Sequence, residues 1–158
     1  MAVVLYRIDD RLIHGQVVIG WGQFLGVRLV ILVDDGVIEE EWEQDLYRAA
    51  MPPGMDVVFA GTEDACTELP AWQADPRRAV VLTGDVPTMA QLARRNPPLV
   101  KEVNLGGIHH RRGRTKRLPY MYLTEDELSQ LEALQSSGVK VMAQDVPSAA
   151  PRDLKALS

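Results

Sequence analysis

The chain has little of several features that commonly define a protein class. Cys66 is its one cysteine among 158 residues, so an intramolecular disulfide is excluded. With acidic neighbours and no basic ones, Cys66 is predicted to be a small packing residue rather than a nucleophile. No apolar run approaches the roughly 20 residues of a membrane-spanning helix, and the first residues lack the pattern of a signal peptide. We therefore expect a cytoplasmic protein.

A surplus of positive charge is also missing. The chain has 22 acidic residues against 17 lysines and arginines, a net charge of -5, which argues against nucleic acid or anionic membrane as its main partner. Its composition, 46% hydrophobic and 25% charged, is that of an ordinary folded protein. No repeat, low-complexity segment or long linker divides the sequence, and we expect one domain over residues 1–158.

Short runs rich in apolar and β-branched residues alternate with helical patterns. Strands are predicted over residues 3–8, 28–33, 55–60, 79–83, 100–105 and 139–143, and helices over 15–24, 39–50, 88–95 and 124–135. Residues 29–33 are apolar without interruption, which is typical of a strand buried on both faces. This alternation predicts an α/β domain: an open, mostly parallel twisted sheet with helices on both faces.

The loop after the first predicted strand concentrates polar chemistry. Residues 9–16 read Asp-Asp-Arg-Leu-Ile-His-Gly-Gln, at the end of a strand where α/β sheets bind their ligands. A neutral His14 can attack a phosphorylated donor. Arg11 can hold two phosphoryl oxygens at once. Asp9 or Asp10 could hold the second ring nitrogen and fix the tautomer.

Backbone groups could complete such a site. The N–H groups of Gly15, Gln16 and Val17 would point at the ligand from a helix N-terminus. Gly106 and Gly107 end the fifth predicted strand and could bring further N–H groups near the same place.

Two plainer interpretations of this loop remain open from the residues alone. His14 could cap a helix while Asp10 and Arg11 form a surface ion pair. The loop could also bind phosphate without any covalent step.

Residues 109–117, His-His-Arg-Arg-Gly-Arg-Thr-Lys-Arg, form a basic segment in an acidic chain. This basic segment is consistent with a solvated loop or with a rim for an anionic ligand or acidic partner. A metal shared by His109 and His110 is not expected, since adjacent strand residues point oppositely. Asp34 and Asp35 are predicted to form a turn and helix start, because no glycine-rich nucleotide fingerprint precedes them.

The string Tyr-Arg-Ile-Asp-Asp-Arg-Leu-Ile-His-Gly-Gln-Val over residues 6–17 resembles the N-terminal signature of a known family. That family is the IIB subunits of the mannose/fructose/sorbose family of the bacterial phosphotransferase system (PTS). Trp21, the segment Val-Asn-Leu-Gly-Gly at residues 103–107, and Thr124 at the start of the late helix are also similar to the family pattern. The resemblance therefore covers nearly the whole chain.

The resemblance implies a sugar phosphotransferase subunit. A IIA histidine would donate a phosphoryl group to Nδ1 of His14, assisted by Arg11, with Asp10 orienting the ring. The phosphate-binding backbone would come from four positions: Gly15, Gln16, Gly106 and Gly107. The IIB protein would then phosphorylate a sugar during uptake through the membrane subunits IIC and IID. No metal or organic cofactor and no nucleic acid is implied, and a homo-oligomer is allowed.

Two alternatives from other classes stay open. A regulatory phosphocarrier would signal through its phosphorylation state without feeding transport, and neighbouring genes for IIC and IID would argue against it. A small flavodoxin-like domain would bind phosphorylated metabolites and never be modified. The basic segment is more highly charged than the family pattern predicts.

Overall fold

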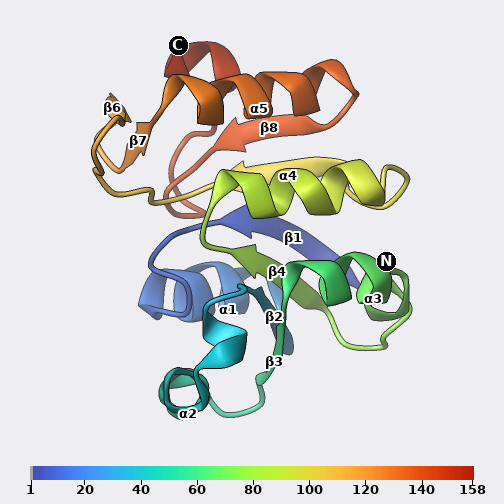
Figure 1. Cartoon of the computed structure of the whole chain (residues 1–158). Coiled ribbons are helices and arrows are strands. Elements are labelled where there is room, and N and C mark those ends of the chain that lie inside the picture. Colours follow the sequence, from blue (N-terminus) through green and yellow to red (C-terminus); the bar gives the residue numbers. More distant parts are fainter. Residues whose placement is uncertain (1) are drawn as a thin grey trace.

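A seven-stranded sheet organises the computed structural model, which describes residues 2–158 (Figure 1). Its strand order is β3-β2-β4-β1-β5-β8-β9, and every pairing is parallel except that of β8 with β9. The strands are β1 (Val3–Ile8), β2 (Leu29–Val33), β3 (Asp56–Ala60), β4 (Ala79–Thr83), β5 (Glu102–Leu105), β8 (Lys140–Ala143) and β9 (Arg152–Asp153). A separate antiparallel hairpin comprises β6 (Thr115–Leu118) and β7 (Met121–Leu123). The predicted open, mostly parallel sheet is confirmed.

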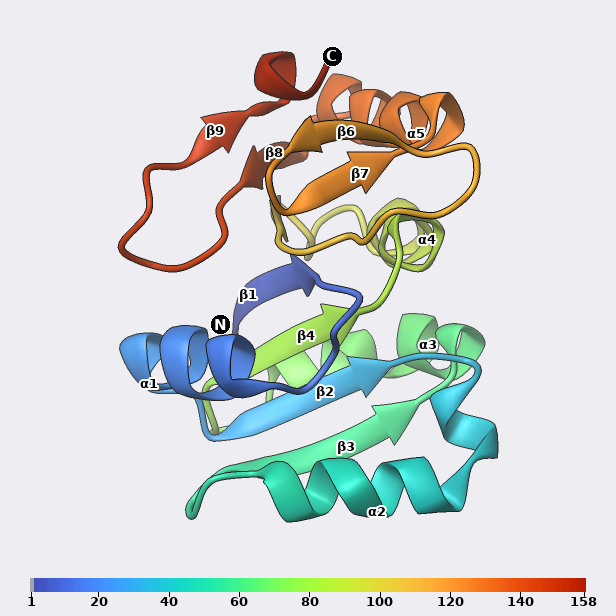
Figure 2. The same ribbon diagram turned by 90° about the vertical axis from the view of Figure 1, so that its left-hand side faces the viewer.

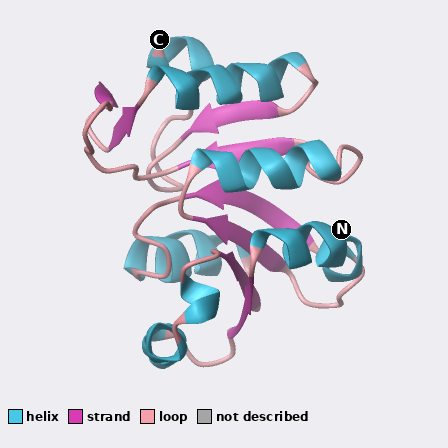
Figure 3. Cartoon of the chain, viewed as in Figure 1, coloured by secondary structure: helices cyan, strands magenta, loops and turns pink. Residues whose placement is uncertain are grey.

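Helices cover both faces of this sheet (Figures 2 and 3). One face carries a π-helical segment (Gln16–Trp21) that continues into α1 (Gly22–Leu25), and a 3-10 turn (Val37–Glu39) followed by α2 (Glu41–Ala50). The other face carries α3 (Thr62–Gln73), α4 (Val86–Arg95) and α5 (Glu125–Ser136), and a 3-10 helix (Leu154–Leu157) ends the chain. Because crossovers are right-handed, helices on steps toward the β3 edge and toward the β8 edge lie on opposite faces.

The core has two layers, one on each side of the sheet. Leu29, Ile31 and Val33 of β2 belong to the apolar cluster under α3, α4 and α5. Val30 and Leu32 of the same strand belong to the cluster on the α1 and α2 side. All five are fully buried, and burying each such side chain contributes about 2 kcal/mol. The prediction of a strand buried on both faces is confirmed.

Helix α3 is absent from the sequence-based predictions, and it contains Pro70 near its end. Proline has no N–H, so the carbonyl of Cys66, one turn earlier, loses its helical partner. The side-chain amide of Asn96 donates to that carbonyl at 3.2 Å instead. Cys66 is buried, and burial raises the pKa of its thiol, in agreement with a packing role.

Side-chain caps fix two of the helix starts. The Asp34 carboxylate accepts the N–H groups of Gly36 and Val37 at 2.8 and 2.9 Å, which confirms the predicted turn and helix start. At α5, the Thr124 hydroxyl accepts the N–H of Glu127, and the Glu127 side chain accepts the N–H of Thr124. This reciprocal pair is a capping box.

The carboxyl end of β1 is where the connections of the sheet diverge. The chain leaves β1 toward the face that carries α1, whereas it leaves the neighbouring strands β4 and β5 toward the opposite face (Figure 2). Such a switch point opens a crevice at the carboxyl edge. β1 itself runs from Val3 at the amino edge to Ile8 at the carboxyl edge. None of the helices within residues 2–158 combines the length and the apolar character that crossing a bilayer demands.

Candidate functional site

The carboxylate of Asp9, immediately after β1, is the centre of the predicted site. Arg11 donates to it through Nε and Nη2, both at 2.9 Å, and Arg7 donates through Nη2 at 3.1 Å. Asp9 is fully buried. Burial raises the pKa of its carboxyl group, but the His14 imidazole, hydrogen bonds from Arg11 and the charge of Arg7 outweigh it, so the pKa lies well below its usual range. Asp9 is therefore a buried, permanently charged anchor.

The two ring nitrogens of His14 face different groups, and only Nδ1 makes a hydrogen bond. Its Nε2 lies 3.5 Å from Oδ1 of Asp9, and its Nδ1 accepts the backbone N–H of Gln16 at 3.2 Å. An acceptor at Nδ1 places the ring proton on Nε2, facing the carboxylate. The side chain is 21% exposed. The ring is thus oriented with a lone pair on Nδ1 at the rim of the protein.

Arg7 contacts Asp9 from the buried side of the site. Its side chain is fully buried, and its Nη1 donates to the side-chain oxygen of Asn104 and to the carbonyl of Gln144. Burial lowers the pKa of this guanidinium, and Asp9 offsets part of that effect. Trp21 covers it, with the ring centroid 5.1 Å from the guanidinium carbon. Trp21 therefore contacts the buried part of the site, at Arg7.

Arg11 lies nearer to solvent, with a side chain 29% exposed. Its Nε and Nη2 contact Asp9, and Nη2 also lies 3.6 Å from the Asp145 carboxylate. Hydrogen bonding to Asp9 raises the pKa of this guanidinium. The third nitrogen, Nη1, makes no hydrogen bond to any residue in the range 2–158. That nitrogen remains available to a further acceptor.

Asp10 does not take the orienting position expected for it. Its carboxylate accepts the backbone N–H of His109 at 2.7 Å and lies 2.6 Å from Nδ1 of the same residue. Asp9 occupies the position against His14 instead. The physical reason is local: a turn after β1 places Leu12 at φ 61 and brings the imidazole back over the side chain at the strand end.

Gly106 and Gly107 lie at the site, and Gly106 does not take the role expected for it. The N–H of Gly106 donates to the carbonyl of Ile8 at 2.7 Å, so it is not directed at a phosphoryl group. A Cβ on Gly106 would lie 2.2 Å from Nη2 of Arg7 and 2.6 Å from Oδ2 of Asp9, and one on Gly107 would lie 3.0 Å from Nε of Arg11. The two glycines leave room for the charged network.

The start of the first helix borders the imidazole as expected. The N–H of Val17 donates to the carbonyl of His14 at 3.0 Å, so, contrary to expectation, it is not directed at a ligand, whereas the N–H of Gln16 faces the imidazole. A Cβ on Gly15 would have open space around it. An incoming group can therefore approach Nδ1 from the Gly15 side.

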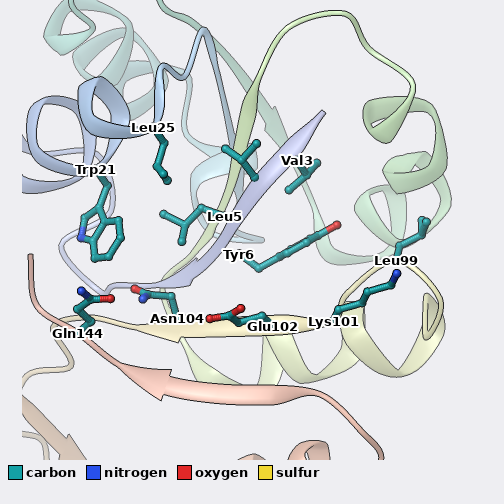
Figure 4. Close-up of a pocket in the computed structure, with 11 residues that line it drawn as sticks. Val3, Leu5, Tyr6, Trp21, Leu25, Leu99, Lys101, Glu102, Asn104 and Gln144 are labelled. Atoms are coloured by element: carbon teal, nitrogen blue, oxygen red, sulfur yellow. The ribbon is translucent and has the colours of Figure 1, made fainter. Parts of the chain in front are cut away.

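A cavity of about 260 Å³ lies behind the network rather than at His14 (Figure 4). Trp21, Asn104 and Gln144, which surround Arg7, line one end of it, and the side chains of Val3, Leu5 and Leu25 form apolar walls. Within residues 2–158, no three His, Cys, Asp or Glu side chains gather in a way that could hold a metal ion. The groups at the site that can take part in a reaction are one imidazole, two guanidinium groups and a carboxylate.

Two contributors are absent from the sequence-based site, Arg7 and Asp145. A charged residue within the apolar β1 is a signal for Arg7, because a buried charge requires a partner. Asp145 follows β8 at the same carboxyl edge of the sheet; its carbonyl accepts Nη2 of Arg7 and Nε1 of Trp21. Only the folded arrangement brings it beside the first strand.

Comparisons with known proteins place the chain among relatives of one family. Residues 3–158 match the family model described as "PTS system sorbose subfamily IIB component". The chain is 30% identical over 146 residues to the N-acetylgalactosamine-specific phosphotransferase enzyme IIB component 1 of Escherichia coli, covering 92% of this chain and 91% of that protein. It is 29% identical to the mannose-specific EIIAB component of E. coli, covering 92% of this chain and 45% of that protein.

A solved structure has the same fold. The crystal structure of the IIBSor domain of the sorbose permease from Klebsiella pneumoniae superposes with a TM-score of 0.89 at 28% identity. The match covers 99% of this chain and 96% of that one.

Proposed function

Because this chain belongs to the PTS sorbose subfamily IIB components, and is therefore a sugar phosphotransferase subunit, we propose that Nδ1 of His14 carries the phosphoryl group. The observation that supports this most directly is the orientation of the ring. The N–H of Gln16 identifies Nδ1 as the nitrogen with the lone pair, and Asp9 faces the protonated Nε2. Nothing in the comparisons favours the regulatory alternative.

The transfer step follows from that orientation. Nδ1 attacks the phosphorus of a phosphohistidine donor whose other ring nitrogen is protonated. The P–N bond of the donor breaks, and the donor ring keeps the electron pair of that bond and leaves as a neutral imidazole. The proton stays on Nε2 of His14, where the ring gains positive charge as the new P–N bond forms. The buried Asp9 carboxylate compensates that charge without having to move.

The phosphoryl oxygens would meet donors already in place. As phosphorus reaches Nδ1, the N–H of Gln16 loses its acceptor there and can donate to a phosphoryl oxygen instead. Arg11 can add its free Nη1 while Nε and Nη2 remain on Asp9, a fixed geometry that favours Arg over Lys. Gly15 leaves the approach open. In the second half of the reaction a sugar hydroxyl attacks phosphorus, loses its proton to water and restores the Nδ1 lone pair.

The partners follow from the family. PTS IIB components work with a IIA protein, with IIC and IID, and with a sugar. The name of the E. coli EIIAB relative supports a IIA protein as the donor for this chain. The names of the relatives that handle N-acetylgalactosamine, mannose and sorbose support a hexose or related sugar as the acceptor.

The test is to incubate the purified chain with a phosphorylated IIA protein and to locate the label by mass spectrometry. We expect one acid-labile phosphoryl group on His14, lost in His14→Ala and retained in His109→Ala and His110→Ala. A label on another residue, or an unlabelled wild-type chain, would refute the proposal.

A further inference from the structure

We infer that the basic segment (residues 109–117) is the surface on which an acidic partner protein docks while it exchanges a phosphoryl group with His14. The inference rests on the function proposed above, and it adds the part of the chain that recognises the partner.

The basic segment begins at the rim of the site. Asp10 lies four residues before His14, in the same loop, and it holds His109 through both the backbone N–H and the ring. Figure 2 shows the chain between β5 and β6, which contains the first part of the basic segment, running between the loop that follows β1 and the β6–β7 hairpin. A protein that contacts this end of the basic segment therefore lies near the loop that carries His14.

Ion pairs fix the basic segment to the fold. Arg114 donates to Glu127 of α5 through Nε at 3.0 Å and Nη2 at 2.8 Å, and these side chains are 9% and 10% exposed. The Nη1 of Arg114 also donates to the carbonyl of His109 at 3.0 Å. Arg117 pairs with Glu125 at 2.9 Å. With Asp10 at one end and α5 at the other, the segment is a fixed support rather than a loose loop.

Three cations of the basic segment remain exposed. Arg111, Arg112 and Lys116 form no ion pair with any residue between positions 2 and 158. The turn between them depends on Gly113, whose φ is 89°. The segment itself contains no carboxylate, although the chain as a whole has a net charge of -5. Unpaired positive charges at fixed positions attract a negatively charged partner and repel a positive one.

The position of these charges favours a protein partner over a membrane. The loop that carries His14 is joined to the basic segment through Asp10 and His109, so a bilayer held by the segment would compete with the phosphoryl donor for this side of the molecule. A phosphorylated protein, by contrast, brings its own negative charge to this rim.

The experiment measures phosphoryl transfer from a phosphorylated IIA protein to the full chain and to a triple variant, Arg111→Glu, Arg112→Glu and Lys116→Glu. At an ionic strength of about 0.01 M, where the Debye length is about 30 Å, we expect the variant's kcat/KM to fall about tenfold or more through KM, with kcat unchanged. At about 1 M salt, where the Debye length is about 3 Å, the two proteins should converge.

Two controls separate docking from chemistry. A matched triple variant, Arg94→Glu, Lys101→Glu and Lys140→Glu, makes the same charge change at exposed positions toward the amino edge of the sheet, and it should behave like wild type. Potassium phosphoramidate is a small donor without a docking surface: its P–N bond breaks, ammonia leaves, and the phosphoryl group bonds to His14. It should label wild type and both variants equally.

The possible outcomes test the docking surface separately from the proposed phosphorylation of His14. A wild-type chain that takes no phosphoryl group on His14 from the IIA protein refutes the proposed function. Labelling of His14 with equal KM and salt dependence in wild type and the segment variant overturns the docking surface alone. Loss of binding to anionic phosphatidylserine vesicles with an unchanged KM for the donor would assign the basic segment to lipid and overturn the inference as well.

Discussion

The buried carboxylate of Asp9 faces one imidazole and two guanidinium groups, and its neighbour Asp10 faces a different histidine. From the sequence, the His14 and Arg11 positions could be predicted, because their side chains suit phosphoryl transfer and follow a strand end. The choice between the two aspartates could not be made, since consecutive side chains diverge and the turn at Leu12 decides which one meets the ring.

Asp9→Asn tests how much the charge of this carboxylate stabilises the fold. Removing one partner of a buried ion pair leaves Arg7 uncompensated, and we expect a loss of about 3 kcal/mol in the free energy of unfolding near neutral pH. Because the folded-state pKa of Asp9 is depressed, its contribution is complete above the ordinary value of 3.8 and declines as the pH falls below it. Urea unfolding at a series of pH values should show the difference between the two proteins shrinking in acid.

Asp10→Asn is the matched comparison. Asp10 pairs with a side chain of His109 that is 70% exposed, so we expect a loss below about 1 kcal/mol. A difference between wild type and Asp9→Asn that stayed constant across the acid range would show that something other than the Asp9 charge is responsible.

At the scale of elements, the strands were more predictable than the pieces between them. Residues 3–8 and 79–83 match β1 and β4 residue for residue, because short runs rich in apolar and β-branched residues allow few alternatives. Helix α3 buries Thr62, Ala65, Cys66 and Leu69. Most of these side chains are small, so the hydrophobic periodicity of the helix is weak, and Pro70 predicts the end of a helix rather than its interior. The remote amide of Asn96, which makes the proline tolerable, cannot be seen in the local sequence.

Gly106 directly follows β5 and lies against the side chains of Arg7 and Asp9. Its lack of a side chain leaves room for this ion pair. Gly106→Ala would place a Cβ within 2.6 Å of both, and we expect a loss of about 1–3 kcal/mol in the free energy of unfolding with slower phosphoryl transfer. Gly15→Ala is the control, because its Cβ would meet no atom within 4 Å and its backbone is already helical. Chemical denaturation of both variants measures this; equal stabilities would contradict the crowding argument.

At the scale of the whole molecule, stability should vary across the structure. β1, β2 and β4 lie inside the seven-stranded sheet, whereas the β6–β7 hairpin forms its own two-stranded sheet at the periphery, packs on the core through Met121 and Leu123, and is joined to α5 by the ion pairs of Arg114 and Arg117. We expect amides of the inner strands to exchange hydrogen through global unfolding and those of the hairpin through a smaller local opening. Hydrogen exchange followed by mass spectrometry should resolve the two classes.

Arg114→Ala and Arg117→Ala make this expectation specific. The Arg114 pair is nearly buried, while the partner of Arg117, Glu125, is 85% exposed. The first variant should therefore accelerate exchange in the hairpin much more than the second. Acceleration spread evenly over β1, β2 and β4 would mean that the hairpin is not a separate unit.

The direction of β1 decides how a second protein can be joined to this one. Val3 begins the strand at the amino edge, while His14 follows its other end, and six strand residues span about 20 Å. A donor protein fused to the N-terminus would be attached at the amino edge of the sheet, whereas His14 lies at the carboxyl edge. A flexible linker would need about 15 residues to span that distance. A rigid helical linker at the N-terminus would keep the donor protein away from the imidazole of His14.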